Sequence, residues 1–245
     1  MFPISDDNSD VTITPFVNYT LIGINILVFV LLQGIGGNEA FSNAFSLVPK
    51  EVTSGVDIAG IVNITSSGGQ VLGQIHHFNA PFGVYFNFLS SMFMHGDVMH
   101  IFGNMLFLWI FGDNIENLIG HFRFAVFYIL CGFAAAVSQV IMSPGSVIPM
   151  LGASGAISGI LGGYILLFPT RNVKALIFRF ITTVPAYVAL GIWIGYQILL
   201  GFLNSSESGG VAYAAHIGGF VAGVVLIKVF ALGTQKSRRI PGRPY

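Results

Sequence analysis

A serine and a histidine are the candidate reactive pair of this strongly apolar chain. Ser154 stands between glycines in Gly152-Ala153-Ser154-Gly155, and His216 begins a second glycine-containing stretch near the C-terminal end. A serine hydroxyl becomes an effective nucleophile when an adjacent base takes its proton. Histidine is the side chain whose ordinary pKa suits that task near neutral pH. If these two residues meet, they form the smallest set of groups for nucleophilic hydrolysis.

Two further polar residues carry donors that such chemistry needs. His100 and Asn104 are four residues apart, which puts them on one face of a helix. The tetrahedral intermediate of acyl transfer carries a negatively charged oxygen that hydrogen-bond donors must stabilise. The Asn104 amide, the His100 ring N–H and the backbone N–H of Ser154 are the candidate donors.

The composition places these residues in a membrane protein. Of the 245 residues, 54% are hydrophobic and only 8% are charged, whereas a soluble domain carries about 25% charged residues. Ten basic and ten acidic side chains cancel, so the charge gives no indication of a nucleic-acid partner. The single cysteine, Cys131, excludes an intrachain disulfide. We expect one polytopic membrane domain.

Six apolar segments are candidates for the helices that position the reactive residues, because each approaches the ~20 residues that cross a bilayer. They cover about residues 15–33, 98–118, 122–142, 152–169, 183–203 and 211–231. The first lacks the basic start of a signal peptide. The predicted fold is all-α, a six-transmembrane-helix bundle over 15–231. A polar segment at 1–14 precedes it and a basic tail at 232–245 follows.

Basic residues predict which way the bundle faces. They gather at or near the even-numbered connections and the C-terminal tail, whereas only Lys50 falls on the opposite side. By the positive-inside rule both termini are therefore cytoplasmic, and residues 34–97 form a long first outer loop. The residues that carry this argument are Arg123, Arg171, Lys174, Arg179, Lys228, Lys236, Arg238, Arg239 and Arg243.

In this topology the four polar residues share one depth. His100, Asn104, Ser154 and His216 all lie near the outer starts of helices. Polar groups inside a membrane are costly, and they usually face the bundle interior or a water-filled cavity. No Asp or Glu occupies the outer half of the helices that carry them. A Ser–His dyad is therefore favoured over a triad with a carboxylate.

Glycine spacing indicates how the serine and the histidine meet. Gly155 and Gly159 are four residues apart after Ser154, and Gly219 and Gly223 are four apart after His216. Small residues at this spacing form grooves along which two membrane helices pack closely. Packing of these two grooves would bring Ser154 and His216 together.

Three motifs in this order and spacing resemble the rhomboid intramembrane serine proteases. They are His95-Gly-Asp-Val-Met-His100-Ile-Phe-Gly-Asn104, Gly152-Ala-Ser154-Gly155 and Ala215-His216-Ile-Gly-Gly219-Phe-Val-Ala-Gly223. The resemblance runs over about residues 86–231. It implies a rhomboid-type bundle in which Ser154 is the nucleophile, His216 the general base, His100 and Asn104 oxyanion stabilisers, and Gly152 the residue that shapes the backbone beside them.

The resemblance also implies partners and location. It implies that neither a cofactor nor a metal takes part, and that the substrates are membrane-spanning proteins cut near the outer end of their transmembrane segments. We expect a multi-pass protein of a bacterial plasma membrane that contacts lipid and no nucleic acid. The oligomeric state stays open.

Two positions depart from the family pattern. Phe86-Asn87 stands where some members carry Trp-Arg, and Ser158 stands where some carry a tyrosine stacked on the histidine. Another residue must then hold the His216 ring, and Tyr213 is one candidate. Gln139 and Gln197 are interpreted as interhelical hydrogen bonders, and the adjacent His76 and His77 as solvated loop residues rather than a metal pair.

Two alternatives belong to other functional classes. A catalytically inactive rhomboid-like protein that binds membrane proteins would use the same scaffold, but it is expected to have lost the serine or the histidine, and both are present. A small transporter often contains two repeated halves with broken helices at matching positions. The first and last three predicted spans share no convincing repeat.

Overall fold

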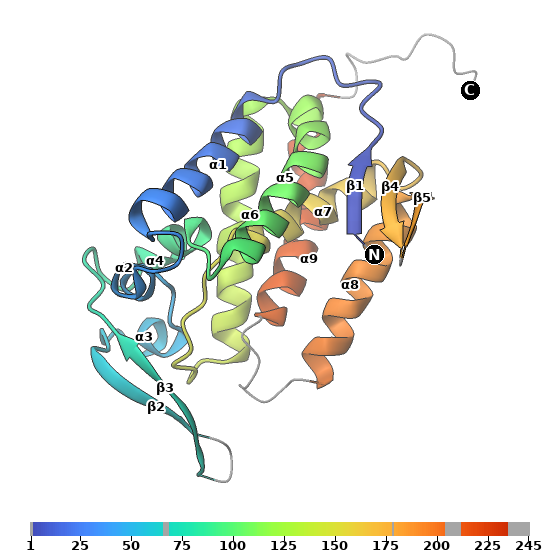
Figure 1. Cartoon of the computed structure of the whole chain (residues 1–245). Helices are drawn as coiled ribbons and strands as arrows, with labels where there is room; N and C mark the ends of the chain where they lie inside the picture. Colours follow the sequence, from blue (N-terminus) through green and yellow to red (C-terminus); the bar gives the residue numbers. More distant parts are fainter. Residues whose placement is uncertain (1, 66–68, 178, 204–211, 235–245) are drawn as a thin grey trace.

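A helical bundle dominates the computed structural model, which describes residues 2–65, 69–177, 179–203 and 212–234 (Figure 1). Four of its helices are long and apolar enough to cross a membrane: α5 (Val98–Ile119), α6 (His121–Met142), α8 (Ala186–Leu203) and α9 (Tyr213–Phe230). Two apolar helices are shorter. These are α1 (Phe16–Leu27), which continues into the π-helical η1 (Val28–Leu32), and α7 (Ser154–Leu167). Any crossing beyond the four long helices depends on these two.

All six predicted segments coincide with apolar helices, with ends shifted by a few residues. The largest differences concern the fourth and fifth segments. Residues 152 and 153 precede α7 instead of belonging to it, and residues 183–185 belong to a strand before α8 begins. Hydropathy locates an apolar segment well, whereas the first helical residue depends on local backbone geometry.

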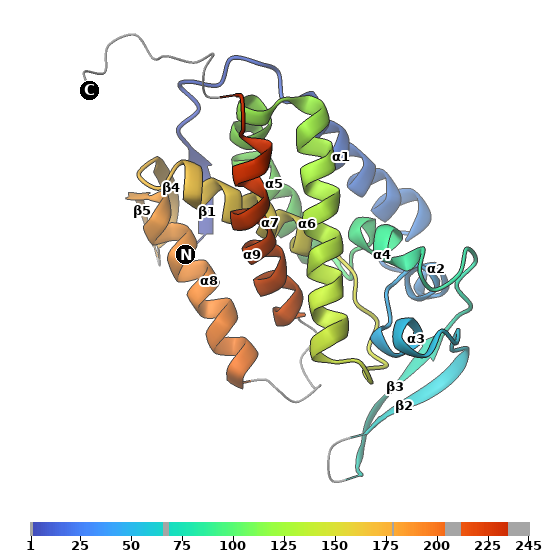
Figure 2. The ribbon, with the colours of Figure 1, turned by 180° about the vertical axis from the view of Figure 1, so that it is seen from behind.

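Helix α7 occupies the centre of the bundle, against α5, α6 and α9 (Figures 1 and 2). Ten consecutive residues of α7, from Gly155 to Tyr164, are buried. A Cβ atom at Gly219 would collide with the carbonyl oxygen of Gly155, and one at Gly223 with that of Gly159. Helices α7 and α9 therefore touch backbone to backbone, as small residues allow in membrane helices.

Two small sheets show that the expectation of an all-α chain is wrong in part. Strands β1 (Phe2–Asp6), β4 (Asn172–Ile177) and β5 (Phe180–Pro185) form an antiparallel sheet in the order β1-β4-β5. Phe2 pairs with Leu176 and Asp6 with Val173, with a register shift between Pro3 and Ser5. Strands β2 (Gly60–Thr65) and β3 (Val71–His77) form a separate antiparallel hairpin. The N-terminal segment, predicted only as polar chain, is thus tied to the connection between α7 and α8.

A polar cluster fixes the N-terminal segment to the end of α5. The Asn114 amide donates to Asp6 at 2.7 Å, and the Asn8 amide donates to Asp113 at 2.7 Å. Arg171 forms an ion pair with Asp10 at 2.5 Å. Burial raises the pKa of Asp6 to about 7, and the nearby Asp113 carboxyl adds to this shift.

Glu116 fastens the start of α1 to the same end of α5. Its carboxylate is fully buried and accepts the backbone N–H groups of Val17 at 2.8 Å and Asn18 at 2.7 Å. These N–H groups lie in the first turn of α1, where helical donors lack an intrahelical partner. Glu116 is therefore a structural acceptor.

The described residues between 33 and 97 fold into several short elements at the opposite end of the bundle (Figure 1). They include α2 (Glu39–Ala44), α3 (Pro49–Ser54), the β2–β3 hairpin, α4 (Asn87–Ser90) and the 3-10 turn η2 (Ser91–Phe93). Asn87 donates to the backbone oxygens of Ala44 and Ser46, so it ties α4 to α2. An isolated antiparallel β-bridge between Leu47 and Met150 ties this segment to the chain before α7.

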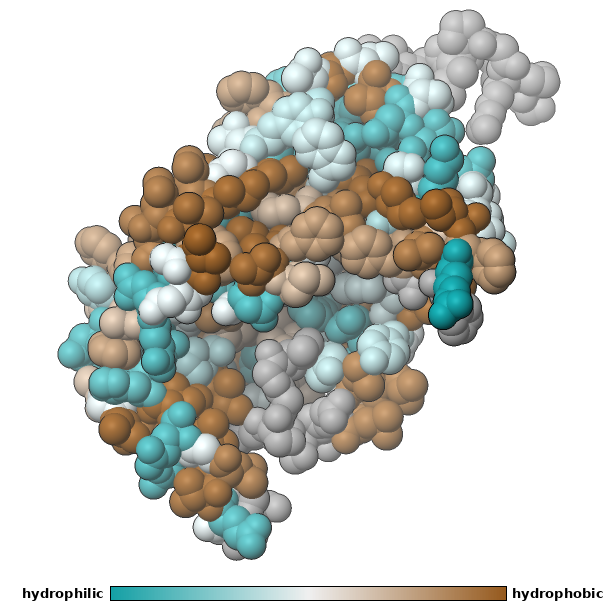
Figure 3. Space-filling view, viewed as in Figure 1, coloured by the Kyte–Doolittle hydropathy of each residue, from teal (hydrophilic) through white to brown (hydrophobic). Residues whose placement is uncertain are grey.

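The bundle presents a broad apolar surface. Large hydrophobic side chains are exposed on several helices, for example Leu31 (70%) on η1, Ile141 (70%) on α6 and Phe202 (79%) on α8. Figure 3 shows apolar residues gathered along α1 and hydrophilic residues at the end of the bundle where α1 begins. An exposed apolar surface of this extent suits lipid as its solvent.

Candidate active site

Ser154 is the first residue of α7, and the turn before it has a conformation that requires glycine. Gly152 has φ of +126°, which side-chain-bearing residues rarely adopt. Its N–H donates to the carbonyl oxygen of Ser91 at 2.9 Å. A Cβ at Gly152 would lie 2.8 Å from His100 Nε2. The turn is thus held from behind by η2 while His100 lies directly beside its backbone.

His216 reaches Ser154 from α9. Its Nε2 atom lies 2.8 Å from Ser154 Oγ, within hydrogen-bond distance. The backbone contact of Gly219 with Gly155 lies three residues beyond His216 on α9 and directly after Ser154 on α7, and it sets how closely α9 approaches α7. The structure therefore brings together the serine and the histidine singled out from the sequence, through the glycines expected to face one another.

The other nitrogen of His216 is bound by a residue from a third helix. Nδ1 lies 2.8 Å from Oε1 of Gln197 on α8. The Trp193 ring, one helical turn away, lies 6.1 Å from the imidazole at an interplanar angle of 37°. Tyr213, suggested from the sequence as a support for the histidine, lies instead beside Gly201. Ser158 does not replace the tyrosine of other members, because its hydroxyl donates to the carbonyl oxygen of Ser154 at 2.7 Å.

His100 and Asn104 present donors toward the same region. The Gly96 N–H donates to His100 Nδ1 at 3.3 Å, so the ring proton belongs on Nε2, the atom beside Gly152. The backbone N–H of His100 donates to Asp97, which caps α5. Asn104 is 8% exposed, and its amide nitrogen is buried without a hydrogen-bond partner in the described part of the chain. Both side chains thus hold an N–H that is free for a ligand.

A cavity of about 990 Å³ connects these groups. Its lining includes His100, Asn104, Ser154, His216 and Gln197. This volume is at the upper end of the range for pockets that hold small ligands or peptide segments. A second cavity of about 440 Å³ between α5 and α8 shares Phe107, Trp193 and Gln197 with the first, and Pro3 of β1 also lines it.

The two glutamines of the predicted helices have different partners. Oε1 of Gln139 on α6 accepts the backbone N–H of Ala215 on α9 at 3.3 Å, an interhelical hydrogen bond as predicted. Gln197 also bridges two helices, but its partner is the imidazole of His216. The contact of Gln197 with His216 was not predicted from the sequence. The one available signal is that Trp193 and Gln197 are four residues apart and so share a helix face.

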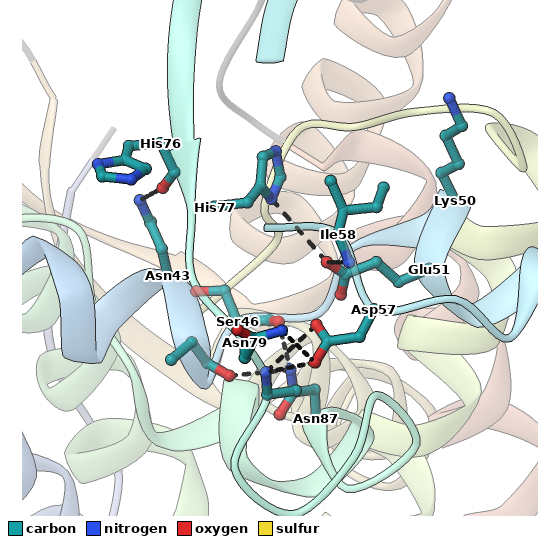
Figure 4. Close-up of polar contacts among 12 residues, drawn as sticks. Asn43, Ser46, Lys50, Glu51, Asp57, Ile58, His76, His77, Asn79 and Asn87 are labelled. Atoms are coloured by element: carbon teal, nitrogen blue, oxygen red, sulfur yellow. Dashed lines mark hydrogen bonds and ion pairs between the residues drawn. The ribbon is translucent and has the colours of Figure 1, made fainter. Parts of the chain in front are cut away.

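His76 and His77 point in different directions, and His77 is not the solvated residue expected (Figure 4). The His76 ring packs on Phe78 with centroids 4.2 Å apart. His77 is 2% exposed, and its Nδ1 lies 4.0 Å from Oε1 of Glu51. Burial lowers the pKa of His77 and raises that of Glu51 to about 7, so both shifts favour the neutral side chains. Within the described residues, no group of three or more His, Cys, Asp or Glu side chains could hold a metal ion.

The basic tail residues Lys236, Arg238, Arg239 and Arg243, which contribute to the predicted orientation, lie outside the described residues.

Comparison with known proteins gives a family match over most of the bundle. The model of the Rhomboid domain matches residues 83–232. Rhomboid protein 1, mitochondrial, of Saccharomyces cerevisiae is 28% identical over 229 residues, which cover 90% of this chain and 55% of the yeast protein. Rhomboid protease GluP of Bacillus subtilis is 26% identical over 224 residues, which cover 91% of this chain and 36% of GluP.

A third similar protein carries a different description. Inactive rhomboid protein 1 of Drosophila melanogaster is 30% identical over 125 residues, which cover 48% of this chain and 8% of the fly protein. The chain thus spans about half the length, or less, of these relatives.

Proposed function

Because this chain belongs to the rhomboid family, we propose that it is an intramembrane serine endopeptidase that cuts transmembrane segments of other membrane proteins. The observation that supports this most directly is the 2.8 Å contact between Ser154 Oγ and His216 Nε2. The two atoms meet in a cavity large enough for an extended peptide and water. Ser154 and His216 are both present, whereas an inactive relative is expected to lack one of the two residues.

In the proposed mechanism, His216 acts first as a base and then as an acid. Its Nε2 atom takes the Ser154 proton as Oγ attacks the scissile carbonyl carbon. The same proton then passes to the leaving amine, and the peptide C–N bond breaks. An acyl-enzyme ester on Ser154 remains. A water molecule, deprotonated by His216, hydrolyses this ester and releases the second product.

The negative oxygen of each tetrahedral intermediate needs donors that are in place beforehand. We assign this role to the Asn104 amide, the His100 Nε2–H group and the backbone N–H of Ser154. The first has no other partner in the described chain, and the second lies beside Gly152. Gly152 contributes by its positive φ, which turns the backbone ahead of Ser154 without a Cβ that would displace His100.

The substrate must present an unwound backbone to Ser154. Peptide carbonyls in an intact helix are hydrogen-bonded and shielded by the turn of side chains around them. We therefore expect small or helix-breaking residues near the scissile bond to favour cleavage, since they lower the cost of unwinding. Cleavage near the outer end of the substrate helix follows from the proposed depth of the dyad.

We further propose a six-span membrane domain over about residues 15–231 with both termini in the cytoplasm. This places residues 34–97 in the outer compartment as a long first loop. The basic residues Arg123, Arg171, Lys174 and Lys228 support this orientation. A bacterial plasma membrane suits it, whereas the similar yeast protein is described as mitochondrial.

The decisive experiment removes the nucleophile. Ser154→Ala, purified in detergent and given a transmembrane model substrate, should lose cleavage entirely while keeping the helical signal and thermal stability of the wild type. Ser158→Ala is the matched control, because it removes a hydroxyl from the next turn of the same helix. It should keep most of the activity. A serine-directed fluorophosphonate should label the wild type at Ser154 and not the Ser154→Ala variant.

The same experiment separates the competing function. One similar protein is described as inactive, so a non-catalytic protein that binds transmembrane helices is a specific alternative. That function predicts no cleavage by the wild type, no fluorophosphonate labelling, and equal binding of the model substrate by wild type and Ser154→Ala. Cleavage that persists in the alanine variant, with contaminating proteases excluded, would contradict the assignment of Ser154.

A further inference from the structure

Gln197 is the only polar residue among the four buried side chains of α8, which are Ala186, Ala189, Leu190 and Gln197. Most of the remaining α8 surface is exposed and apolar. A lone amide at the buried face of such a helix needs a polar partner, because an unmade hydrogen bond there costs free energy. The partner is the imidazole of His216, with 2.8 Å between Gln197 Oε1 and His216 Nδ1.

This contact determines which nitrogen of His216 carries the proton. An amide oxygen only accepts hydrogen bonds, so Nδ1 must carry the hydrogen that is donated to it. The lone pair then lies on Nε2, which faces Ser154 Oγ at 2.8 Å. That is the tautomer a general base requires. In the other tautomer Nε2–H would donate to the serine oxygen, and the hydroxyl proton would have no acceptor.

We propose that Gln197 is the positioning residue of the dyad, which fixes the tautomer and ring orientation of His216. The inference rests on the proposed proteolytic function. Gln197 takes the place that a buried carboxylate occupies in a Ser–His–Asp site, but as a neutral acceptor. A neutral acceptor orients the ring without the strong stabilisation of imidazolium that a carboxylate charge provides. His216 thus remains a base without a buried negative charge in the membrane.

A matched control exists for the simpler view that Gln197 only joins helices. Gln139 makes a hydrogen bond of the same kind to the same helix, since its Oε1 accepts from the backbone N–H of Ala215. Residue 215 precedes His216, yet Gln139 does not bind the imidazole in the described structure. If Gln197 served only as an interhelical hydrogen bonder, Gln197→Leu and Gln139→Leu would have similar effects on kcat and on thermal stability.

The kinetic test uses these variants in purified, full-length protein with a transmembrane model substrate. Removal of the tautomer-fixing group costs about 10⁴-fold in a Ser–His–Asp protease. A neutral amide has less to lose, and we expect Gln197→Leu to lower kcat by roughly 10- to 100-fold with KM changed by less than about twofold. Gln139→Leu should lower thermal stability by a similar amount and leave kcat near the wild-type value.

A conservative replacement supplies a readout that a structural role would not move. Gln197→Glu restores an acceptor at the same position and adds a charge, so it should recover much of the lost kcat. The carboxylate also stabilises imidazolium, and the acid limb of the kcat/KM profile should therefore move to higher pH by about 1 unit. Gln139→Glu should leave that limb in place.

A measurement independent of activity keeps this inference separate from the proposed function. The ¹⁵N chemical shifts of His216 in labelled protein report its tautomer directly. We expect Nδ1–H in the wild type and in Ser154→Ala, and a mixture with Nε2–H in Gln197→Leu. Nε2–H in the wild type, or equal tautomer populations in wild type and Gln197→Leu, would overturn the role of Gln197 even if proteolysis is established. An inactive wild type with the expected shifts would instead count against the proposed function alone.

Discussion

Asn104 holds a hydrogen-bond donor that has no partner in the described chain. An unpaired buried amide costs about 1–3 kcal/mol, and folded proteins usually avoid that cost. We therefore interpret the free donor beside the Ser154–His216 pair as serving a group that arrives with the substrate. The Asn104 amide then makes its hydrogen bond only when the reaction intermediate is present, and this bond stabilises the intermediate.

This interpretation predicts a dissociation of activity from stability. Asn104→Ala should lower kcat by up to about 10²-fold, with KM little changed, because loss of one oxyanion donor costs on the order of 10²–10³ in a soluble protease and two donors remain. Its thermal stability should be equal to or above that of the wild type, since no hydrogen bond to the side-chain nitrogen is lost. The double variant with His100→Ala should be markedly less active than either single variant.

Asn87 gives the opposite behaviour and serves as the control. Its amide donates to Ala44 and Ser46, so Asn87→Ala should lower the unfolding temperature while kcat of the folded fraction stays near wild type. Detergent-phase thermal unfolding together with steady-state kinetics checks both variants. Full activity in Asn104→Ala would leave the oxyanion role to His100 and the backbone.

At this scale, the sequence predicted the residues that motifs define and missed the one that only the tertiary structure identifies. Ser154, His216, His100 and Asn104 have residue types that are costly in a membrane, at spacings that place them at one level. Gln197 lies on a separate helix with no motif around it. Its role depends on the tertiary contact of α8 with α9, which no local pattern in α8 determines.

The interface between α7 and α9 is packed too closely to accommodate side chains at its glycines. Gly219 and Gly223 rest on carbonyl oxygens of Gly155 and Gly159, so even one methyl group would push the two helices apart. The Ser154–His216 hydrogen bond spans this same interface. Separation of the helices should therefore weaken catalysis as well as folding.

Gly223→Ala tests this coupling. We expect a loss of about 1–3 kcal/mol in the free energy of unfolding, the usual cost of overpacking, together with a lower kcat. Gly191→Ala is the control, because a Cβ at Gly191 in α8 would meet no atom within 4 Å. It should be neutral or slightly stabilising, as Ala favours helix over Gly. Equal stability of the two variants in reversible unfolding would contradict the close approach of α7 and α9.

Helices were predictable from the sequence and strands were not, for a physical reason. A membrane helix can be recognised in a sequence from a long continuous apolar segment, and its backbone hydrogen bonds are all local. β1 and β4 are five and six residues long, and their pairing joins Phe2 to Leu176. Nothing in a five-residue segment determines so distant a partner or the register shift at Pro3.

The described molecule has a polar end near the start of α1 (Figure 3), and the described residues of 33–97 fold at the other end (Figure 1). The proposed orientation assigns the first to the cytoplasm and the second to the outside. Cys131, the single cysteine of the sequence, does not interfere with a cysteine-labelling test of this orientation, because its side chain is fully buried. Wild-type protein should therefore not react with a membrane-impermeant maleimide.

Two single cysteines placed in a Cys131→Ala background check the orientation. Asn172→Cys lies at an exposed position of β4, and Leu72→Cys at a position of β3 that is 57% exposed. In intact cells or spheroplasts, the reagent should label Leu72→Cys and spare Asn172→Cys, and both should react after the membrane is opened. The reverse pattern would refute the orientation and move the dyad to the cytoplasmic half of the membrane.

The pairing of β1 with β4 also restricts how the chain can be threaded through the bilayer. Two strands joined edge to edge must stand on the same side, so the chain between residues 6 and 172 crosses an even number of times. With α5 and α6 as two crossings, α1 with η1 and α7 must either both cross or both stay on one side. A topology in which only one of the two short helices crosses would put β1 and β4 on opposite sides of the membrane, where they could not pair.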